Sequence, residues 1–413
     1  MPNFTQNKFT RPETFRRIRP DLLLAWLKQW ESYFAKRGLI LPGADTQLVL
    51  PMEASVGKPK FGAQWNPSAP QIDYDNLVRV FMEPTPDMPA ELADSLHLVR
   101  EMGTARGMDA MLEECRARGV DLGLGDDASP EDVALKLWLT DPRMLENLQN
   151  CKEVSRPRGF QYFTTDASPL PQFEGPSLEQ LRALEERLEG FYVAWRRGAG
   201  TRVFAYCQQR LWHTVPEWVF LVRHGAPFRR EEAMENGEPT SVLYRPRKYA
   251  VLKYDSLRGE LGVYCSAARE QKILLKAFGK SLFGREDFFP GNAKFNLEPI
   301  VRLGRESLAC ADVMGIEEVR LTEVVFYQHE TPWRRTIEQA DDIFALVEKA
   351  KLTWPKEVQD IASATFAVKL WRQKRARRVT IMPSNRAIYS RDEDSGILER
   401  WMEAREFIVP PKG

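Results

Sequence analysis

The stretch that decides the fold is FAVKLWRQKRARRVTIMPSNRAIYSRDEDSGILERWMEA, residues 366–404. Apolar and polar residues alternate on both sides of a cationic turn, with Phe366, Val368 and Leu370 before it and Val379 and Ile381 after it. An alternation of period two is typical of strands with one buried face. The stretch therefore predicts a hairpin, which a helix follows to complete a ββα unit.

The preceding stretch, EVRLTEVVFYQHETPWRRTIEQADDIFALVEKA at residues 318–350, has the same order of strand, basic turn, short strand and helix. Its RRTI at residues 334–337 corresponds to RRVTI at residues 377–381. We expect two ββα-like units over residues 311–413, with their helices packed on one face of an antiparallel sheet. They form a possible internal repeat, and chance similarity over so few positions is the alternative.

Short runs of β-forming residues lie upstream, at residues 201–207, 217–225, 241–255 and 260–266. A turn at residues 256–259 connects the last two as a hairpin. The amphipathic sequence that follows predicts a helix that ends at Gly284. Together these features predict an antiparallel β/α domain over residues 200–310.

Residues 1–154 are expected to form a helical domain. In DLLLAWLKQWESYFAKRG, residues 21–38, the apolar residues share one helical face. Further helices are predicted at residues 73–82, 89–102, 105–118 and 129–140. Residues 155–199 are expected to be a proline-rich linker and a connecting helix that Ser177 caps. The predicted fold class is therefore α+β, a helical N-terminal domain followed by a mainly antiparallel β-sheet region with helices packed on it.

Composition limits the location and the general chemistry. The 413 residues carry 59 Lys and Arg against 58 Asp and Glu, so only a local patch could attract nucleic acid or an anionic membrane. The five cysteines are scattered, which fits a reducing cytoplasm better than a disulfide framework or a zinc site. No signal peptide or membrane-spanning run is evident, so we expect a cytoplasmic protein without membrane contact.

The sequence contains no complete motif for catalysis or nucleotide binding. KAFGKSLFG at residues 276–284 contains the Gly-Lys-Ser of a phosphate-binding loop, but position 274 is Leu where that loop requires glycine. The histidines have no metal-ligand spacing, and no nucleophile elbow occurs. Paired acids lie at helix starts or in turns. We therefore assign no catalytic residue, metal ligand or cofactor.

The strongest candidate for a function is the cationic turn of residues 372–378. Exposed guanidinium groups on a hairpin tip suit phosphate contacts, and an adjacent Trp can stack on bases. Two further basic segments join it as candidates. The predicted nucleic-acid-binding residues are Arg372, Lys374, Arg375, Arg377, Arg378 and Trp371, with Arg334, Arg335 and Trp333, and with Arg245, Arg247 and Lys248.

Two ordinary explanations compete with this interpretation. The turn can be a solvated hairpin that discourages edge aggregation, or it can pair with the acids at residues 392–394. The leading hypothesis is a non-enzymatic cytoplasmic protein that binds DNA or RNA phosphates, a protein partner or a second copy, as a subunit of a larger bacterial assembly. The alternatives are a nuclease or other phosphodiester hydrolase whose site assembles only in three dimensions, and a protein–protein scaffold with an exposed Trp26 or Trp30.

Overall fold

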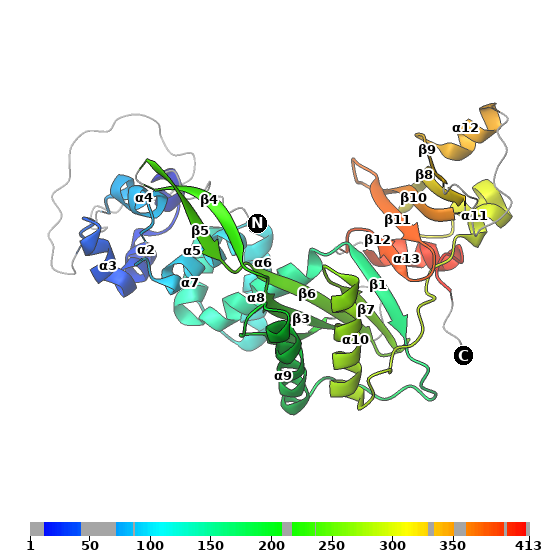
Figure 1. The fold of residues 1–413 in the computed structure, drawn as a ribbon. Coiled ribbons are helices and arrows are strands. Elements are labelled where there is room, and N and C mark those ends of the chain that lie inside the picture. Colours follow the sequence, from blue (N-terminus) through cyan, green and yellow to red (C-terminus); the bar gives the residue numbers. More distant parts are fainter. Residues whose placement is uncertain are drawn as a thin grey trace. The chain divides into compact units, whose positions relative to one another are not determined.

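The structure, a computed structural model, describes residues 12–42, 72–85, 87–208, 217–235, 237–328, 334–350, 361–391 and 395–409. The chain divides into two compact units, Met1–Lys152 and Glu153–Gly413. The first is helical, and the second is built on an antiparallel sheet (Figure 1). The described residues thus confirm the predicted α+β class.

Unit 1 consists of short helices around an aromatic core. They are α1 (Pro12–Arg16), α2 (Pro20–Leu27), the 3-10 helix η2 (Lys28–Trp30), α3 (Glu31–Lys36), α4 (Tyr74–Met82), α5 (Ala90–Met102), α6 (Ala105–Arg118), α7 (Pro130–Thr140) and the start of α8 (Pro142–Ser155). The helix predicted over residues 21–38 is divided into α2, η2 and α3. Most of its apolar face is buried, including Leu23, Trp26, Leu27, Tyr33 and Phe34, whereas Trp30 is partly buried.

Caps and aromatic packing explain this helical arrangement. Ser129 and Asp132 form a capping box that starts α7. Trp26 is 1% exposed, its ring lies 6.1 Å from that of Phe81, and its Nε1 donates a hydrogen bond to the Ser95 hydroxyl over 3.0 Å. Because Trp26 is buried and bonded, it does not provide the exposed aromatic surface that the scaffold alternative requires.

The described residues of unit 2 form a ten-stranded antiparallel sheet in the order β2-β3-β6-β7-β1-β12-β11-β10-β8-β9, and a separate two-stranded sheet, β4-β5. The strands are β1 (Gly159–Thr164), β2 (Arg202–Gln208), β3 (Glu217–Gly225), β4 (Arg229–Glu235), β5 (Glu238–Tyr244), β6 (Arg247–Asp255), β7 (Glu260–Tyr264), β8 (Ile316–Gln328), β9 (Arg334–Gln339), β10 (Ile361–Leu370), β11 (Arg377–Met382) and β12 (Arg386–Ile388). The helices are α9 (Leu178–Ala194), α10 (Ala268–Phe283), α11 (Glu298–Leu303), η3 (Gly304–Leu308), α12 (Ile343–Ala350) and α13 (Ser395–Ala404).

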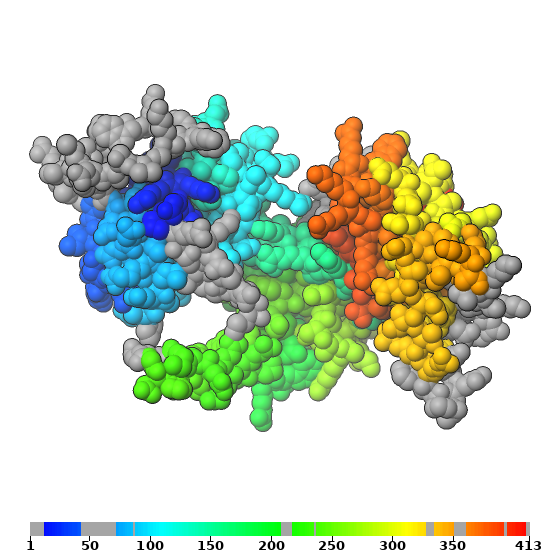
Figure 2. Space-filling view, turned by 90° about the horizontal axis from the view of Figure 1, so that it is seen from above, coloured from blue at the N-terminus to red at the C-terminus, as the bar shows by residue number. Residues whose placement is uncertain are grey.

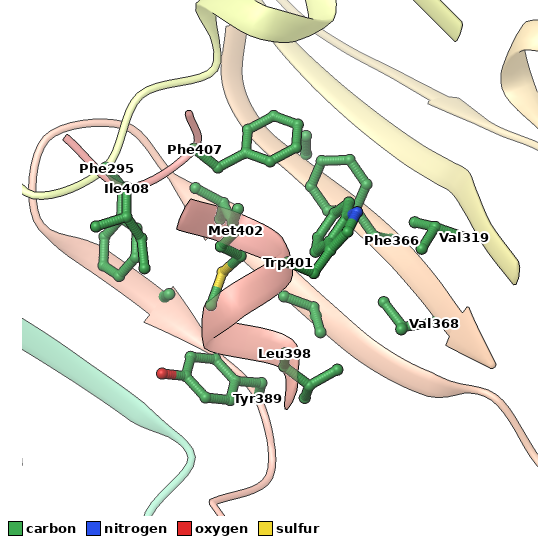
Figure 3. Packing of buried hydrophobic residues seen from close by; sticks show 14 of the residues in the cluster. Phe295, Val319, Phe366, Val368, Tyr389, Leu398, Trp401, Met402, Phe407 and Ile408 are labelled. Atoms are coloured by element: carbon green, nitrogen blue, oxygen red, sulfur yellow. The ribbon is translucent and has the colours of Figure 1, made fainter. Parts of the chain in front are cut away.

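The alternation along the strands produces two apolar clusters. On β6, Leu252 packs with α9 and α10 in one cluster, whereas Val251 belongs to the other cluster, which includes residues of α13. In that second cluster, Phe366 of β10 contacts Trp401 of α13 and Phe407, as Figure 3 shows. Strands β8 and β9 form a hairpin that α12 follows, and strands β10 and β11 form a hairpin that the short strand β12 and then α13 follow.

The passage expected to be a linker contains β1, and this expectation is corrected. β1 pairs with β7 on one side and β12 on the other, so it connects the two halves of the sheet. Its buried residues, Phe160 and Tyr162, alternate over only six positions between proline-rich segments. Such a short alternation is a weak signal in the sequence.

Helix α10 confirms that KAFGKSLFG is no phosphate loop. The helix runs through Gly279 and ends at Gly284, which is in the left-handed conformation with φ of 77°. A Cβ at Gly279 would lie 2.6 Å from the Arg285 carbonyl oxygen, so this glycine permits a close approach of the following segment.

Candidate nucleic-acid interface

The predicted cationic turn is the tip of the β10–β11 hairpin. Val368 lies opposite Arg377, and Phe366 lies opposite Val379. The inward-facing side chains of both strands are fully buried, so the core holds the two strands in register; they include Phe366, Val368, Val379 and Ile381. The tip is anchored where the Trp371 N–H donates to the Gly315 carbonyl oxygen over 3.0 Å.

The cations of the turn fall into two groups. Arg377 Nε donates to Gln373 Oε1 over 3.0 Å, and Arg378 pairs with Glu323 at 3.2 Å. Arg372, Lys374 and Arg375 are exposed, and across the described ranges of the chain no carboxylate pairs with any of them. Three cations at the tip are therefore available to an external anion, whereas the two at the start of β11 have internal partners.

Trp371 lies beside these three cations, and 58% of its surface is exposed. An exposed indole next to guanidinium groups can stack on an unpaired base while the cations contact phosphates. The acids at residues 392–394, the proposed internal partners of the turn, lie outside the described residues.

The outer face of the sheet next to the tip contributes a cation that the sequence analysis missed. Arg320 of β8 and Arg378 of β11 lie opposite Ala367 of β10 from either side, about 10 Å apart across two strand spacings. Arg320 also pairs with Glu318 at 3.4 Å. The alternation of apolar and polar residues along β8 predicts which face of the sheet Arg320 occupies. Only the order of the strands shows that Arg320 and Arg378 flank the same residue of β10.

The other predicted basic segments do not join the tip. Arg334 and Arg335 begin β9 opposite Gln328 and Tyr327, at the end of β8 remote from the tip. The tip adjoins Ile316, so roughly 40 Å of strand separates the two sites. Trp333 lies outside the described residues.

In the third basic segment, which contains Arg245, Arg247 and Lys248, the first residue has a structural role. Arg245 donates to the carbonyl oxygens of Arg196 and Ala226, and its guanidinium lies 4.3 Å from the centre of the Phe228 ring. Arg247 and Lys248 are exposed at the start of β6, five strands along the sheet from β10, a distance of about 24 Å. Arg245 therefore holds the chain between β3 and β6, and the three basic segments are separate in space.

A buried polar cluster around Glu270 is the second candidate site in unit 2. The Glu270 carboxylate is 1% exposed and accepts hydrogen bonds from Tyr192 at 3.0 Å, Arg197 at 2.8 Å and the Ser266 hydroxyl at 2.8 Å. His224 Nε2 lies 3.2 Å from the same carboxylate. The donors come from α9, β3 and the segment before α10, three parts of the chain with no common motif.

The surroundings of Glu270 favour the ionised form of its carboxylate. Burial acts to raise the pKa of Glu270, but hydrogen bonds from His224 and Ser266 and the charges of His224 and Arg197 outweigh it and lower the pKa to about 2. Burial and the adjacent carboxylate raise the pKa of Tyr192 far above its ordinary value. A carboxylate with this pKa and these fixed donors is a poor general base, so the cluster connects α9, β3 and α10 structurally.

Three further observations concern metal binding, membrane-spanning helices and similarity to known proteins. In the part of the chain that the structure describes, no three His, Cys, Asp or Glu side chains could together hold a metal ion. Among the same residues, no helix has both the length and the apolar character needed to cross a membrane. Comparisons with models of protein families and with curated proteins return no match for this chain.

Proposed function

We propose that this protein binds nucleic acid through the tip of the β10–β11 hairpin. Arg372, Lys374 and Arg375 would contact phosphates, and Trp371 would stack on a base. The observation that carries the proposal is the group of three exposed cations without a carboxylate partner in the described chain, beside an indole that is 58% exposed. The contacts would be to the backbone and would show little sequence preference.

The charge balance of the whole chain supports a local interface. A formal net charge of +1 provides little long-range attraction for a polyanion. Binding would therefore depend on the tip, with Arg378 and Arg320 contributing less because each already pairs with an acid. A cytoplasmic location is part of the proposal, supported by five cysteines that form no disulfide bond with one another.

The test is binding of labelled single-stranded and duplex oligonucleotides at several salt concentrations. We expect the variant Arg372→Ala/Lys374→Ala/Arg375→Ala to bind more weakly and to have a flatter salt dependence. Losing three phosphate contacts should reduce the slope of log K against log salt by about 2 for single strands and about 3 for duplex. The matched control, Arg182→Ala/Arg187→Ala/Lys272→Ala, removes three exposed charges from α9 and α10 and should bind normally.

Trp371→Ala separates base stacking from charge. We expect it to weaken single-strand binding by about 1–3 kcal/mol and to affect duplex binding less, because paired bases are not available for stacking. Equal binding by the wild type and the triple variant would refute the proposal. Cleavage of the oligonucleotides in the presence of magnesium would show instead that the protein is a phosphodiester hydrolase. The absence of binding at low salt would exclude nucleic acid and favour a protein partner for the turn.

A further inference from the structure

An arm of residues 226–246 extends the β3–β6 pair beyond the large sheet. Gly225 lies opposite Arg247, the Ala226 N–H donates to the Pro246 carbonyl oxygen over 2.8 Å, and the ribbon continues as β4 and β5. Within the described residues, β4 and β5 pair only with each other. Figure 2 shows this arm in bright green, extending away from the other strands of unit 2. A two-stranded ribbon has no core of its own, so its apolar side chains have few internal partners.

One face of the arm exposes large apolar side chains. Met234 and Leu243 are each 69% exposed, and Phe228 is 65% exposed. On β4 and β5, Arg230 lies opposite Leu243 and Met234 lies opposite Pro239, which places these residues on the same face. An open hollow lies largely on this face and is lined by Arg230, Glu232, Ala233, Met234, Pro239, Thr240 and Ser241.

The side chains that β4 and the preceding residue contribute to this face are arranged in a nearly symmetric order of apolar and charged groups. Phe228, Arg230, Glu232 and Met234 occupy alternate positions, so the face has an apolar, a cationic, an anionic and an apolar group in turn. A two-fold axis at the level of residue 231 places Phe228 of one copy opposite Met234 of the other. It likewise places Arg230 of one copy opposite Glu232 of the other. The pattern is therefore complementary to itself when two arms lie antiparallel and face to face.

We propose that this face of the arm binds the same face of a second copy of this chain. In that arrangement Phe228 packs against Met234 of the second copy, and Arg230 pairs with Glu232 of the second copy. Two-fold symmetry repeats both contacts. A second copy always offers this order of charges, whereas an unrelated partner would have to match it independently, and this charge complementarity determines our choice of occupant.

The size of the arm sets the strength of the association. A strand of seven residues is about 24 Å long, so one face of the ribbon covers roughly 240 Å². This is well below the roughly 800 Å² that each partner contributes to a standard stable interface. We therefore expect a reversible dimer that forms at micromolar or higher concentrations. This inference does not depend on the proposed nucleic-acid binding, because the arm and the hairpin tip are different segments.

Charge reversal tests the proposal with the full chain in sedimentation velocity from about 1 to 200 μM. Arg230→Glu places two acids opposite each other at both charged contacts and should weaken dimerisation on the order of ten-fold or more. Glu232→Arg should do the same with two cations. The double variant Arg230→Glu/Glu232→Arg restores opposite charges at every contact and should dimerise like the wild type.

Arg229→Glu is the matched control, because Arg229 lies on the opposite face of β4 and should leave dimerisation unchanged. All three substituted positions are in an exposed ribbon, so circular dichroism and Tm should be the same for every variant. A wild-type chain that remains monomeric at 200 μM would overturn the proposal. So would unchanged dimerisation in the single reversals, or a double variant that fails to recover.

Discussion

Glu270 connects three parts of unit 2 at the scale of a single residue. Tyr192 and Arg197 donate to it from α9 and the turn after it, and His224 approaches it from β3. His224 Nδ1 also lies 2.8 Å from the Gly225 carbonyl oxygen, so both ring nitrogens face acceptors. His224 thus links the Glu270 carboxylate of α10 to the backbone at the end of β3.

The low pKa of Glu270 predicts a loss of stability in acid. Because the pKa falls from its ordinary value of 4.5 to about 2 on folding, the folded state binds this proton less readily than the unfolded state. The stabilisation is fully present above about pH 4.5 and is lost as the pH falls towards 2. The shift corresponds to about 3 kcal/mol at neutral pH. Urea unfolding of wild type and Glu270→Gln from pH 3 to 7 measures it, and parallel pH profiles would contradict it.

At the scale of elements, unit 2 depends on the packing of α13 against β10. The Phe366 ring lies 5.3 Å from that of Trp401 and 5.1 Å from that of Phe407, and all three side chains are fully buried (Figure 3). The hairpin that presents the cationic tip is therefore held by the same cluster that seats the C-terminal helix.

Removing the Phe366 ring should leave a cavity in this cluster. We expect Phe366→Ala to lower the free energy of unfolding by about 3–5 kcal/mol, and Phe366→Leu to cost clearly less because it leaves a smaller cavity. Trp371→Ala, five residues away on the exposed tip, should change it by no more than about 0.5 kcal/mol. Chemical denaturation measures all three, and similar losses for Phe366→Ala and Trp371→Ala would refute this account of the hairpin.

The start of α9 offers a second test at this scale. The Ser177 hydroxyl accepts from the Gln180 N–H over 3.1 Å, and the Gln180 side chain accepts from the Ser177 N–H over 2.9 Å. Ser177→Ala should cost about 1 kcal/mol of unfolding free energy, whereas Ser177→Asp should retain most of the cap. Equal stability of both variants in urea would show that the cap contributes nothing measurable.

At the scale of the whole molecule, the chain has separate cores in its two units. Trp26 belongs to the core of unit 1, and Phe366 belongs to a core of unit 2. Mutations in cores that share no contacts should act independently. We expect Trp26→Ala to lower one calorimetric transition and Phe366→Ala to lower another. A single transition that both variants shift equally would show instead that the chain unfolds as one cooperative unit.

Several helices and one hairpin of this protein could be predicted from local sequence patterns alone. Helix periodicity and the caps at Ser129 and Ser177 predicted α7 and α9, and the two-residue alternation around the cationic turn predicted the β10–β11 hairpin. The glycine missing at position 274 excluded a phosphate loop. These signals suffice because capping, turn formation and amphipathic periodicity depend on residues only a few positions apart.

The contacts between residues from distant segments, in contrast, became evident only in the folded structure. It placed β1 inside the sheet, set Arg320 beside Arg378 across Ala367, and separated Arg334 and Arg335 from the tip by the length of β8. It also gathered around Glu270 donors from segments up to 78 residues away. Strand order and register follow from burial of faces that belong to distant segments, and no local pattern in the sequence contains that information.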